Sequence, residues 1–241
     1  MMKDFSIRLG GVTIRCAARY QDTESYFERF IVPFDPDAPL ASVTEMDWDF
    51  WRRNGAVPSA YLEYSSLTGS CSDVLLAYNR CAFHAVAVRY QGKAWLIAAG
   101  SGVGKTTQMR TLQELYPGEF SVISGDRPIL DLLENGDVFV HPSPWNGKEE
   151  IGGADGAPLA GIVCLRRGEE NIVERMSNRD AIIPVYQSVI QTGETENGIR
   201  LAASFVDSLL TRVPAWRMVN QDVPDSTKLL FETVMKGGGV Q

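Results

Sequence analysis

The amino-acid sequence predicts an α/β protein in two parts: a small β-rich subdomain over residues 1–80 and a larger domain with a mixed β-sheet over residues 81–236. Three patterns predict this fold class. Alternating apolar residues flank a tight turn near the N-terminus, a second alternating pair leads into a glycine-rich loop, and helical periodicity begins directly after that loop. Residues 237–241 include three consecutive glycines and are expected to form a flexible tail.

The N-terminal part begins with a predicted β-hairpin. Residues 5–9 and 12–16 alternate between apolar and polar side chains, and Gly10-Gly11 between them suits a two-residue turn. From residue 19 to residue 80 the pattern is mixed, because prolines interrupt any long helix while tryptophans and tyrosines supply aromatic surface. We expect a small β-rich subdomain here and leave its strand order open.

The larger part begins with a second predicted hairpin. Residues 85–90 (Ala-Val-Ala-Val-Arg-Tyr) form a second alternating run, Gln91-Gly92 forms the turn, and the apolar run 94–99 forms a buried strand. The buried strand therefore has an antiparallel neighbour that directly precedes it in the chain. A parallel neighbour would need a crossover of about a dozen residues or more, so this connection predicts a mixed sheet.

Strand and helix signals continue to alternate toward the C-terminal end. Helical spacing over residues 106–116 stops at Pro117-Gly118. Apolar residues that repeat every three or four positions between Ile199 and Leu209 predict a long amphipathic helix, which Pro214 closes. Short β-rich runs between these helices lie at 120–124, 138–140 and 162–165.

The composition excludes several classes of protein. The 241 residues include 23 Lys and Arg against 30 Asp and Glu, a formal charge of −7, and no basic cluster that would favour a nucleic-acid partner. The apolar run 94–99 is far shorter than the ~20 residues of a membrane helix, and the first residues lack the apolar region of a signal peptide, so we expect a cytoplasmic protein without a membrane partner. The four cysteines form no C-x-x-C pair and are expected to be reduced and buried.

The most informative stretch is Ala99-Gly100-Ser101-Gly102-Val103-Gly104-Lys105-Thr106, between the predicted buried strand and the predicted helix. It has the spacing of a Walker A phosphate-binding loop (P-loop), with alanine in place of the first glycine. Glycines let consecutive backbone N–H groups surround a phosphate, and the positive end of the helix points at the same anion. Lys105 is expected to reach the β- and γ-phosphates of ATP, and the Thr106 hydroxyl to ligate Mg²⁺. The predicted nucleotide contacts are Gly100, Ser101, Gly102, Val103, Gly104, Lys105, Thr106 and Thr107.

Residues around this loop resemble the HPr kinase/phosphorylase family, whose C-terminal domain shares a P-loop fold with phosphoenolpyruvate carboxykinase. In that family a His-Gly pair precedes the Walker A strand, and His84-Ala85 stands in the corresponding place. An acidic pair follows the next strand, and Gly125-Asp126 matches it with one acid replaced. The resemblance covers roughly residues 80–222. It implies a phosphoenolpyruvate-carboxykinase-like nucleotide-binding domain that uses ATP and Mg²⁺.

The sequence departs from that family at two places. Thr107 occupies the position after the Walker hydroxyl residue, where the family has a glutamate. The family's glycine-rich signature, which helps to engage HPr, has no counterpart, because residues 140–148 fill that region with prolines and a tryptophan. HPr itself is therefore not the expected acceptor.

The candidate chemistry is phosphoryl transfer to a hydroxyl group. Such a reaction needs a positioned γ-phosphate, neutralisation of its charge, and a group that accepts the alcohol's proton. We expect Lys105 to supply charge, Asp126 either to accept the proton or to hold the metal with Thr106, and His84 to orient Asp126. Residues 141–145 are expected to form a rigid substrate-side loop. Further candidate anion contacts are Arg127, Lys148, Arg166 and Arg167.

Three functions compete at this stage. The leading one is an ATP-dependent kinase acting on a serine of a peptide or protein, or on a small alcohol. The second is an ATP-binding accessory protein without phosphotransfer, which the missing acid and Thr107 favour. A carboxykinase-like enzyme is the third, although the chain has only two histidines for the second metal such enzymes recruit. The aromatic residues of 1–80 are a candidate interface for a homo-oligomer.

Overall fold

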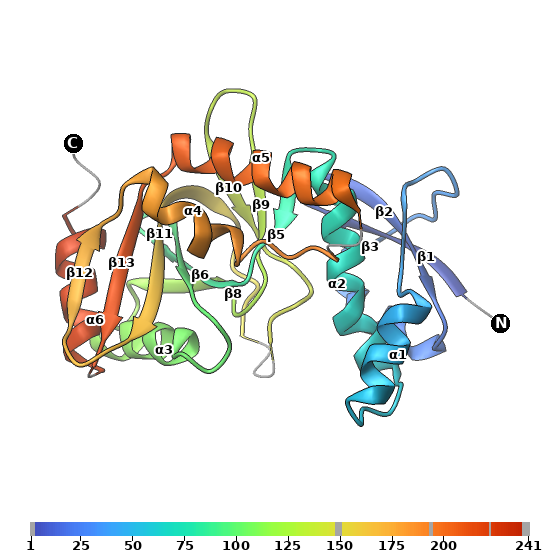
Figure 1. Cartoon of the computed structure of the whole chain (residues 1–241), viewed down its shortest axis with the longest axis horizontal. Helices are drawn as coiled ribbons and strands as arrows, with labels where there is room; N and C mark the ends of the chain where they lie inside the picture. The colour runs from blue at the N-terminus through green and yellow to red at the C-terminus, as the bar shows by residue number, and fades with distance from the viewer. Residues whose placement is uncertain (1–2, 148–150, 193–194, 222, 238–241) are drawn as a thin grey trace.

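The computed structural model describes residues 3–147, 151–192, 195–221 and 223–237. The chain forms a mixed α/β structure with two β-sheets, a four-stranded one near the N-terminus and a nine-stranded one that carries most of the helices (Figure 1). No helix within the described ranges is both long and apolar enough to cross a membrane. All four cysteines are free and buried, as the sequence predicts.

The N-terminal sheet has the strand order β3-β1-β2-β4. Gly10 and Gly11 connect its first two strands with φ angles of 52° and 86°, and these strands pair antiparallel, so the predicted hairpin is present. Both angles lie in the region that glycine adopts without steric cost. The elements are β1 (Lys3–Leu9), β2 (Val12–Ala18), the 3₁₀ segment η1 (Gln21–Phe30), β3 (Ile31–Val32) and β4 (Leu40–Ser42).

Two α-helices complete this part of the chain, and the sequence patterns described above do not predict them. They are α1 (Glu45–Arg53) and α2 (Ala60–Leu76). Thr44 and Asp47 form a capping box at the start of α1, and Ser59 caps α2. The apolar periodicity of α2 is weak because its buried face includes the polar residues Glu63 and Ser72.

The larger sheet is mixed, in agreement with the sequence. β6 (Ala85–Tyr90) and β7 (Lys93–Ala98) pair antiparallel through the turn at Gln91-Gly92, whereas β7 and β11 (Ala157–Arg167) pair parallel. Its main strand order is β5-β9-β10-β11-β7-β6-β8, with β13 beside β11 and β12 beside β13. The remaining strands are β5 (Arg80–Ala82), β8 (Phe120–Ser124), β9 (Ile129–Leu132), β10 (Val138–His141), β12 (Ile172–Arg175) and β13 (Ala215–Asn220).

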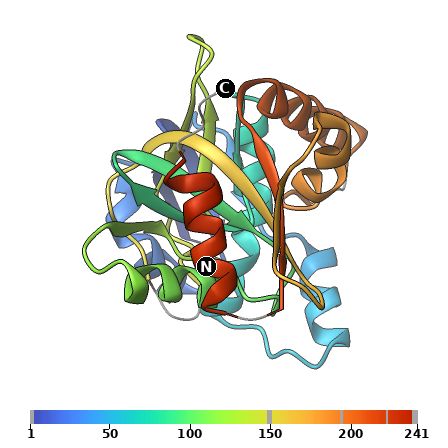
Figure 2. The same ribbon diagram turned by 90° about the vertical axis from the view of Figure 1, so that its left-hand side faces the viewer.

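Helices cover both faces of this sheet (Figure 2). Along β6, Ala85 and Ala87 belong to the core beneath α4 (Asn178–Tyr186) and α5 (Glu196–Arg212). Val86 and Val88 belong to the opposite core, which includes residues of α3 (Lys105–Leu115), of α6 (Asp225–Leu230) and of the following π-helical turn, η2 (Phe231–Met235). The alternation of a strand thus sorts neighbouring side chains into two cores.

A third core joins the N-terminal sheet to the larger sheet. It combines Ile7 and Ile14 of the first hairpin, Leu67 of α2, Ile129 of β9 and Trp145. Each of these side chains is at most 2% exposed. Because α2 contributes to this shared core, the N-terminal part lies directly against the region that follows β8.

Candidate active site

The glycine-rich loop joins β7 to α3. Gly102 has a φ of 75° and Gly104 a φ of 125°, which are conformations that residues with a Cβ rarely adopt. Gly104 is the N-cap of α3 and cannot cap it with a side chain. The first amide groups of α3 have no acceptor within the helix, so they are available to an anion at this end.

The other α-helices of eight residues or more begin differently. α1, α2, α4 and α5 are each capped by a hydroxyl that accepts a hydrogen bond from an amide of the first turn. Within the described ranges, α3 alone combines a glycine N-cap with a first turn free of acidic residues. A negative ligand at α3 would therefore meet no carboxylate in that turn and no capping side chain at the N-cap. The capping residues of the other helices are Thr44, Ser59, Ser177 and Thr195.

Lys105 folds back over the loop that precedes it. Its Nζ donates a hydrogen bond to the carbonyl oxygen of Ala99 at 2.9 Å and lies 3.0 Å from Nε2 of His84. Burial lowers the pKa of Lys105, the nearby Asp126 raises it in part, and Arg127 lowers it further, so the net shift is downward from 10.5. The ammonium group is thus held at the base of the loop with only partial charge compensation.

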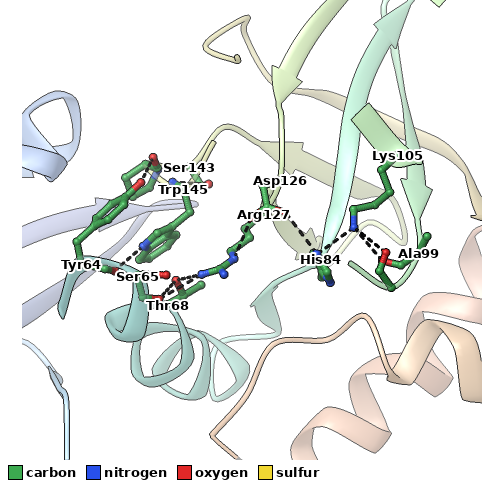
Figure 3. Close-up of polar contacts among 12 residues, drawn as sticks. Tyr64, Ser65, Thr68, His84, Ala99, Lys105, Asp126, Arg127, Ser143 and Trp145 are labelled. Atoms are coloured by element: carbon green, nitrogen blue, oxygen red, sulfur yellow. Dashed lines mark hydrogen bonds and ion pairs between the residues drawn. The ribbon is translucent and has the colours of Figure 1, made fainter. Parts of the chain in front are cut away.

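Asp126 lies between two basic side chains. Its Oδ1 is 3.4 Å from His84 Nε2, and its Oδ2 is 3.2 Å from Arg127 Nε (Figure 3). Burial raises the pKa of Asp126, but the hydrogen bond from His84 and the charges of Arg127, His84 and Lys105 together outweigh it. The net pKa lies below the ordinary 3.8, so this carboxylate is ionised at neutral pH.

One nitrogen of His84 faces both partners. Nε2 lies 3.0 Å from the lysine Nζ and 3.4 Å from the Asp126 carboxylate. A single ring nitrogen either accepts a hydrogen bond, here from the ammonium, or carries a proton and donates it, here to the carboxylate. The imidazole therefore couples Lys105 to Asp126 through the position of one proton.

The position before Asp126 cannot hold a second acid. A Cβ built on Gly125 would lie 2.5 Å from the carbonyl oxygen of Ile151 and 2.7 Å from that of Asn146. Both neighbours are backbone atoms, so they cannot move aside as a flexible side chain does. The segment after β10 packs on the end of β8, which explains why a glycine occupies position 125.

A cleft of about 610 Å³ contains these groups. Of the predicted nucleotide contacts, Ser101, Gly102, Gly104, Lys105, Thr106 and Thr107 line it, together with His84 and Asp126. The other two lie elsewhere: the Val103 side chain packs against the core, and Gly100 lines a neighbouring cavity of about 560 Å³.

The opposite side of the cleft is aromatic, which the sequence analysis did not predict. Tyr61 and Tyr64 of α2 line it together with Trp145. Trp145 belongs to the predicted substrate-side loop, whereas the two tyrosines are not among the residues that the sequence predicts for the site. Their spacing of three residues places them on one face of a helix, and this signal becomes readable only once the helix itself is recognised.

The candidate anion contacts separate in the structure. Arg127 lines the main cleft, Arg166 lines the neighbouring cavity, and Arg167 donates a hydrogen bond to the carbonyl oxygen of Gly102 at 2.7 Å. Lys148 lies outside the described residues. His141 does not line the cleft: its Nε2 lies 3.3 Å from Oδ2 of a buried aspartate, Asp131, and burial lowers its pKa despite that partner.

The residues expected to hold Mg²⁺ line the same cleft. Thr106 is the second residue of α3. Asp126 lies just after the end of β8 and lines the same cleft. A hydroxyl and one carboxylate are oxygen ligands suited to Mg²⁺, which keeps several waters and substrate phosphate oxygens in its shell. No group of three or more His, Cys, Asp or Glu side chains arranged for a metal occurs in the described part of the chain.

Comparisons with known proteins give limited similarity. No protein-family model matches the sequence, and no curated protein matches it. Among solved structures, the Hpr(Ser) kinase/phosphatase from Coxiella burnetii is similar over 65% of this chain and 94% of that chain, with 11% sequence identity and a TM-score of 0.39. A similarity of this size assigns neither activity nor site residues to this chain, so its function has to be inferred from its own cleft.

Proposed function

We propose that this protein is an ATP-dependent kinase that transfers the γ-phosphate to a hydroxyl group. One observation carries the proposal: a lysine, a histidine and a carboxylate are in contact at the mouth of an uncapped, glycine-rich helix start. The contacts are 3.0 Å between Lys105 and His84 and 3.4 Å between His84 and Asp126. An ammonium group suits a phosphate and an ionised carboxylate suits a proton acceptor, and both line one cleft, which supports the proposal.

The loop and Lys105 serve the phosphate chain in this proposal. The first amides of α3 and the glycines before them donate hydrogen bonds to phosphate oxygens, and Lys105 leaves Ala99 to face the γ-phosphate. Mg²⁺, when bound, would be held by the Thr106 hydroxyl with Asp126 nearby and would neutralise charge on the phosphates. Both side chains line the same cleft as Lys105.

Asp126 serves the acceptor. As the alcohol oxygen forms its bond to the γ-phosphorus, the bond from phosphorus to the departing ADP oxygen breaks, and the alcohol proton passes to a carboxylate oxygen of Asp126. His84 and Arg127 each contact one oxygen of that carboxylate, and each oxygen retains a lone pair for the proton. The lowered pKa keeps Asp126 ionised at neutral pH, so its oxygens carry no proton before the reaction.

A second candidate is an ATP-binding accessory protein that transfers no phosphate. The backbone around Gly125 favours this function, because it leaves the site with one carboxylate where a second cannot be accommodated without movement of Ile151 or Asn146. Nucleotide binding through Lys105 is common to both candidates. They differ in whether the γ-phosphate is transferred and, with it, whether Asp126 receives the alcohol's proton.

Transfer of a radioactive γ-phosphate distinguishes the two. The protein is incubated with γ-labelled ATP, Mg²⁺ and a serine peptide library, and Asp126→Asn is compared with the unmodified chain. The kinase proposal expects labelled peptide that falls by about a hundredfold or more in the variant, with ATP affinity retained. Labelling at the same rate in Asp126→Asn overturns the role of Asp126, and ATP binding without any labelling favours the accessory protein.

A further inference from the structure

The aromatic side of the cleft is a rigid surface, defined here as the aromatic wall of Tyr61, Tyr64 and Trp145. The indole Nε1 of Trp145 donates a hydrogen bond to the backbone oxygen of Tyr64 at 2.9 Å, and the Tyr64 hydroxyl donates one to the carbonyl oxygen of Pro144 at 2.6 Å. Trp145 is 2% exposed. These reciprocal bonds fix two of the three rings in place.

The aromatic wall extends out of the cleft onto the surface. Tyr26 stacks on Tyr64 with ring centroids 4.8 Å apart and meets Tyr61 edge-on at 5.9 Å. Tyr26 is 41% exposed and Tyr61 is 51% exposed. These centroid distances of 4.8 and 5.9 Å are comparable to the spacing between residues i and i+2 on one face of an extended chain, which rises ~3.3 Å per residue. A polypeptide segment matches this run of rings, whereas a small alcohol would occupy only its inner end.

The position of Asp126 relates the aromatic wall to the proposed reaction. Figure 3 shows Lys105 and His84 on one side of Asp126, and Arg127, Tyr64 and Trp145 on the other. Arg127 spans the gap, since it contacts Asp126 and donates to Thr68 Oγ1 of α2 at 2.7 Å. In phosphoryl transfer the attacking and leaving oxygens lie roughly in line across phosphorus. A hydroxyl that reaches Asp126 opposite Lys105 must therefore arrive from the side of the aromatic wall.

We propose that the aromatic wall is the acceptor subsite and that it selects a hydroxyl-bearing polypeptide segment with an aromatic side chain next to the acceptor residue. The inference rests on the proposed kinase function and gives the N-terminal part a role in substrate choice. α2 contributes two of the three rings. An aromatic side chain of the acceptor packs on Tyr61 and Tyr64 while its neighbouring hydroxyl faces Asp126.

The test uses two peptides that differ at one residue, Gly-Gly-Phe-Ser-Gly-Gly and Gly-Gly-Ala-Ser-Gly-Gly, and three variants of the full chain. Tyr61→Ala removes the exposed ring, and Tyr61→Phe keeps it. Tyr78→Ala is the matched control, because Tyr78 is similarly exposed, at 47%, and does not line the cleft. Peptide affinity is measured by calorimetry with ADP and Mg²⁺ present, and labelling is measured separately.

The proposal expects the Phe peptide to bind about five- to tenfold more tightly than the Ala peptide. Tyr61→Ala should abolish that preference without changing the affinity for ATP, while Tyr61→Phe and Tyr78→Ala should retain it. Equal affinity for both peptides in the unmodified chain overturns the proposal. So does a Tyr61→Ala variant that loses ATP affinity instead, since the wall would then hold the nucleotide base. Because affinity is measured without transfer, a preference that persists when no peptide is labelled contradicts only the kinase function.

Discussion

The Nζ atom of Lys105 lies 3.0 Å from Nε2 of His84, and the same nitrogen is 3.4 Å from the carboxylate of Asp126. A cation and an anion of the cleft thus share one imidazole nitrogen. Protonation of that nitrogen favours the contact with Asp126 and disfavours the one with Lys105. The proposed phosphate end and the proposed acceptor end of the cleft are therefore electrostatically linked, and the first two predictions concern their titration.

ATP affinity should fall at high pH earlier than the ordinary lysine value implies. In the proposed role the charged form of Lys105 binds phosphate, and burial lowers the pKa of this lysine from 10.5. As pH rises through the lowered value the ammonium is lost, so the dissociation constant for ATP should begin to increase below pH 10.5. A series of titrations from pH 7 upward measures this. Lys105→Arg should bind ATP without that rise, because arginine does not titrate in the range; a rise that persists in the arginine variant assigns it to another group.

Asp126 should contribute to stability against acid. Its pKa in the folded chain lies below the ordinary 3.8, so the folded state favours the ionised form. The contribution is complete above pH 3.8 and is lost as pH falls toward and through the folded value. Asp126→Asn should therefore show a shallower decline in the free energy of unfolding below about pH 4. Urea titrations across this range test it, and identical slopes for both proteins would show that the carboxylate is not held by His84 and Arg127.

Gly125→Ala should destabilise the fold although the substitution adds only a methyl group. The new Cβ would lie 2.5 Å from Ile151 O and 2.7 Å from Asn146 O, and relief of such overlap typically costs about 1–3 kcal/mol. Gly69→Ala in α2 is the control, since its nearest neighbour is a side-chain methyl of Thr192 at 3.3 Å. Urea midpoints should drop for the first variant and should not drop for the second, in which alanine also has the higher helix propensity. Equal midpoints would mean that the segment after β10 is not packed on this position.

Arg127→Lys should loosen the attachment of α2 to the cleft while keeping the positive charge. Arg127 Nη1 donates to the Ser65 carbonyl oxygen at 3.2 Å and to Thr68 Oγ1 at 2.7 Å, while its Nε lies 3.2 Å from Asp126 Oδ2. The single nitrogen of a lysine cannot contact α2 and Asp126 in this way at the same time. We expect a loss of about 1–2 kcal/mol in unfolding free energy. Arg200→Lys, which changes an exposed arginine of α5, should change it by no more than about 0.5 kcal/mol. Similar losses for the two variants would show that the hydrogen bonds from Arg127 to α2 do not contribute to the unfolding free energy.

Part of this architecture could be read from the sequence. The hairpin that precedes the glycine-rich loop, the helix after it and the amphipathic helix α5 all follow from local alternation or helical spacing. The tight turn at Gln91-Gly92 alone required an antiparallel neighbour for β7. These features depend on residues close together in the chain, which is why sequence patterns report them.

Other features depend on contacts between distant segments. α2 buries Glu63, which accepts hydrogen bonds from the backbone of Arg19 and Tyr20, so its inner face does not appear apolar and its periodicity is hidden. The reason for glycine at position 125 is equally non-local, because the atoms that exclude a side chain belong to Asn146 and Ile151. The aromatic wall combines α2 with a loop about eighty residues later, and no local pattern could place them together.

The affinity for ATP of Lys105→Ala tests most directly whether this cleft is a nucleotide site. Isothermal titration with Mg²⁺ and ATP compares it with Lys93→Ala, which removes an exposed lysine at the start of β7. The proposed function predicts tight binding to the unmodified chain and to Lys93→Ala. It predicts a loss of about a hundredfold or more in Lys105→Ala, because a charge-assisted contact in a partly buried site contributes several times RT. Unchanged affinity in Lys105→Ala would contradict the assignment of the glycine-rich loop as the phosphate site.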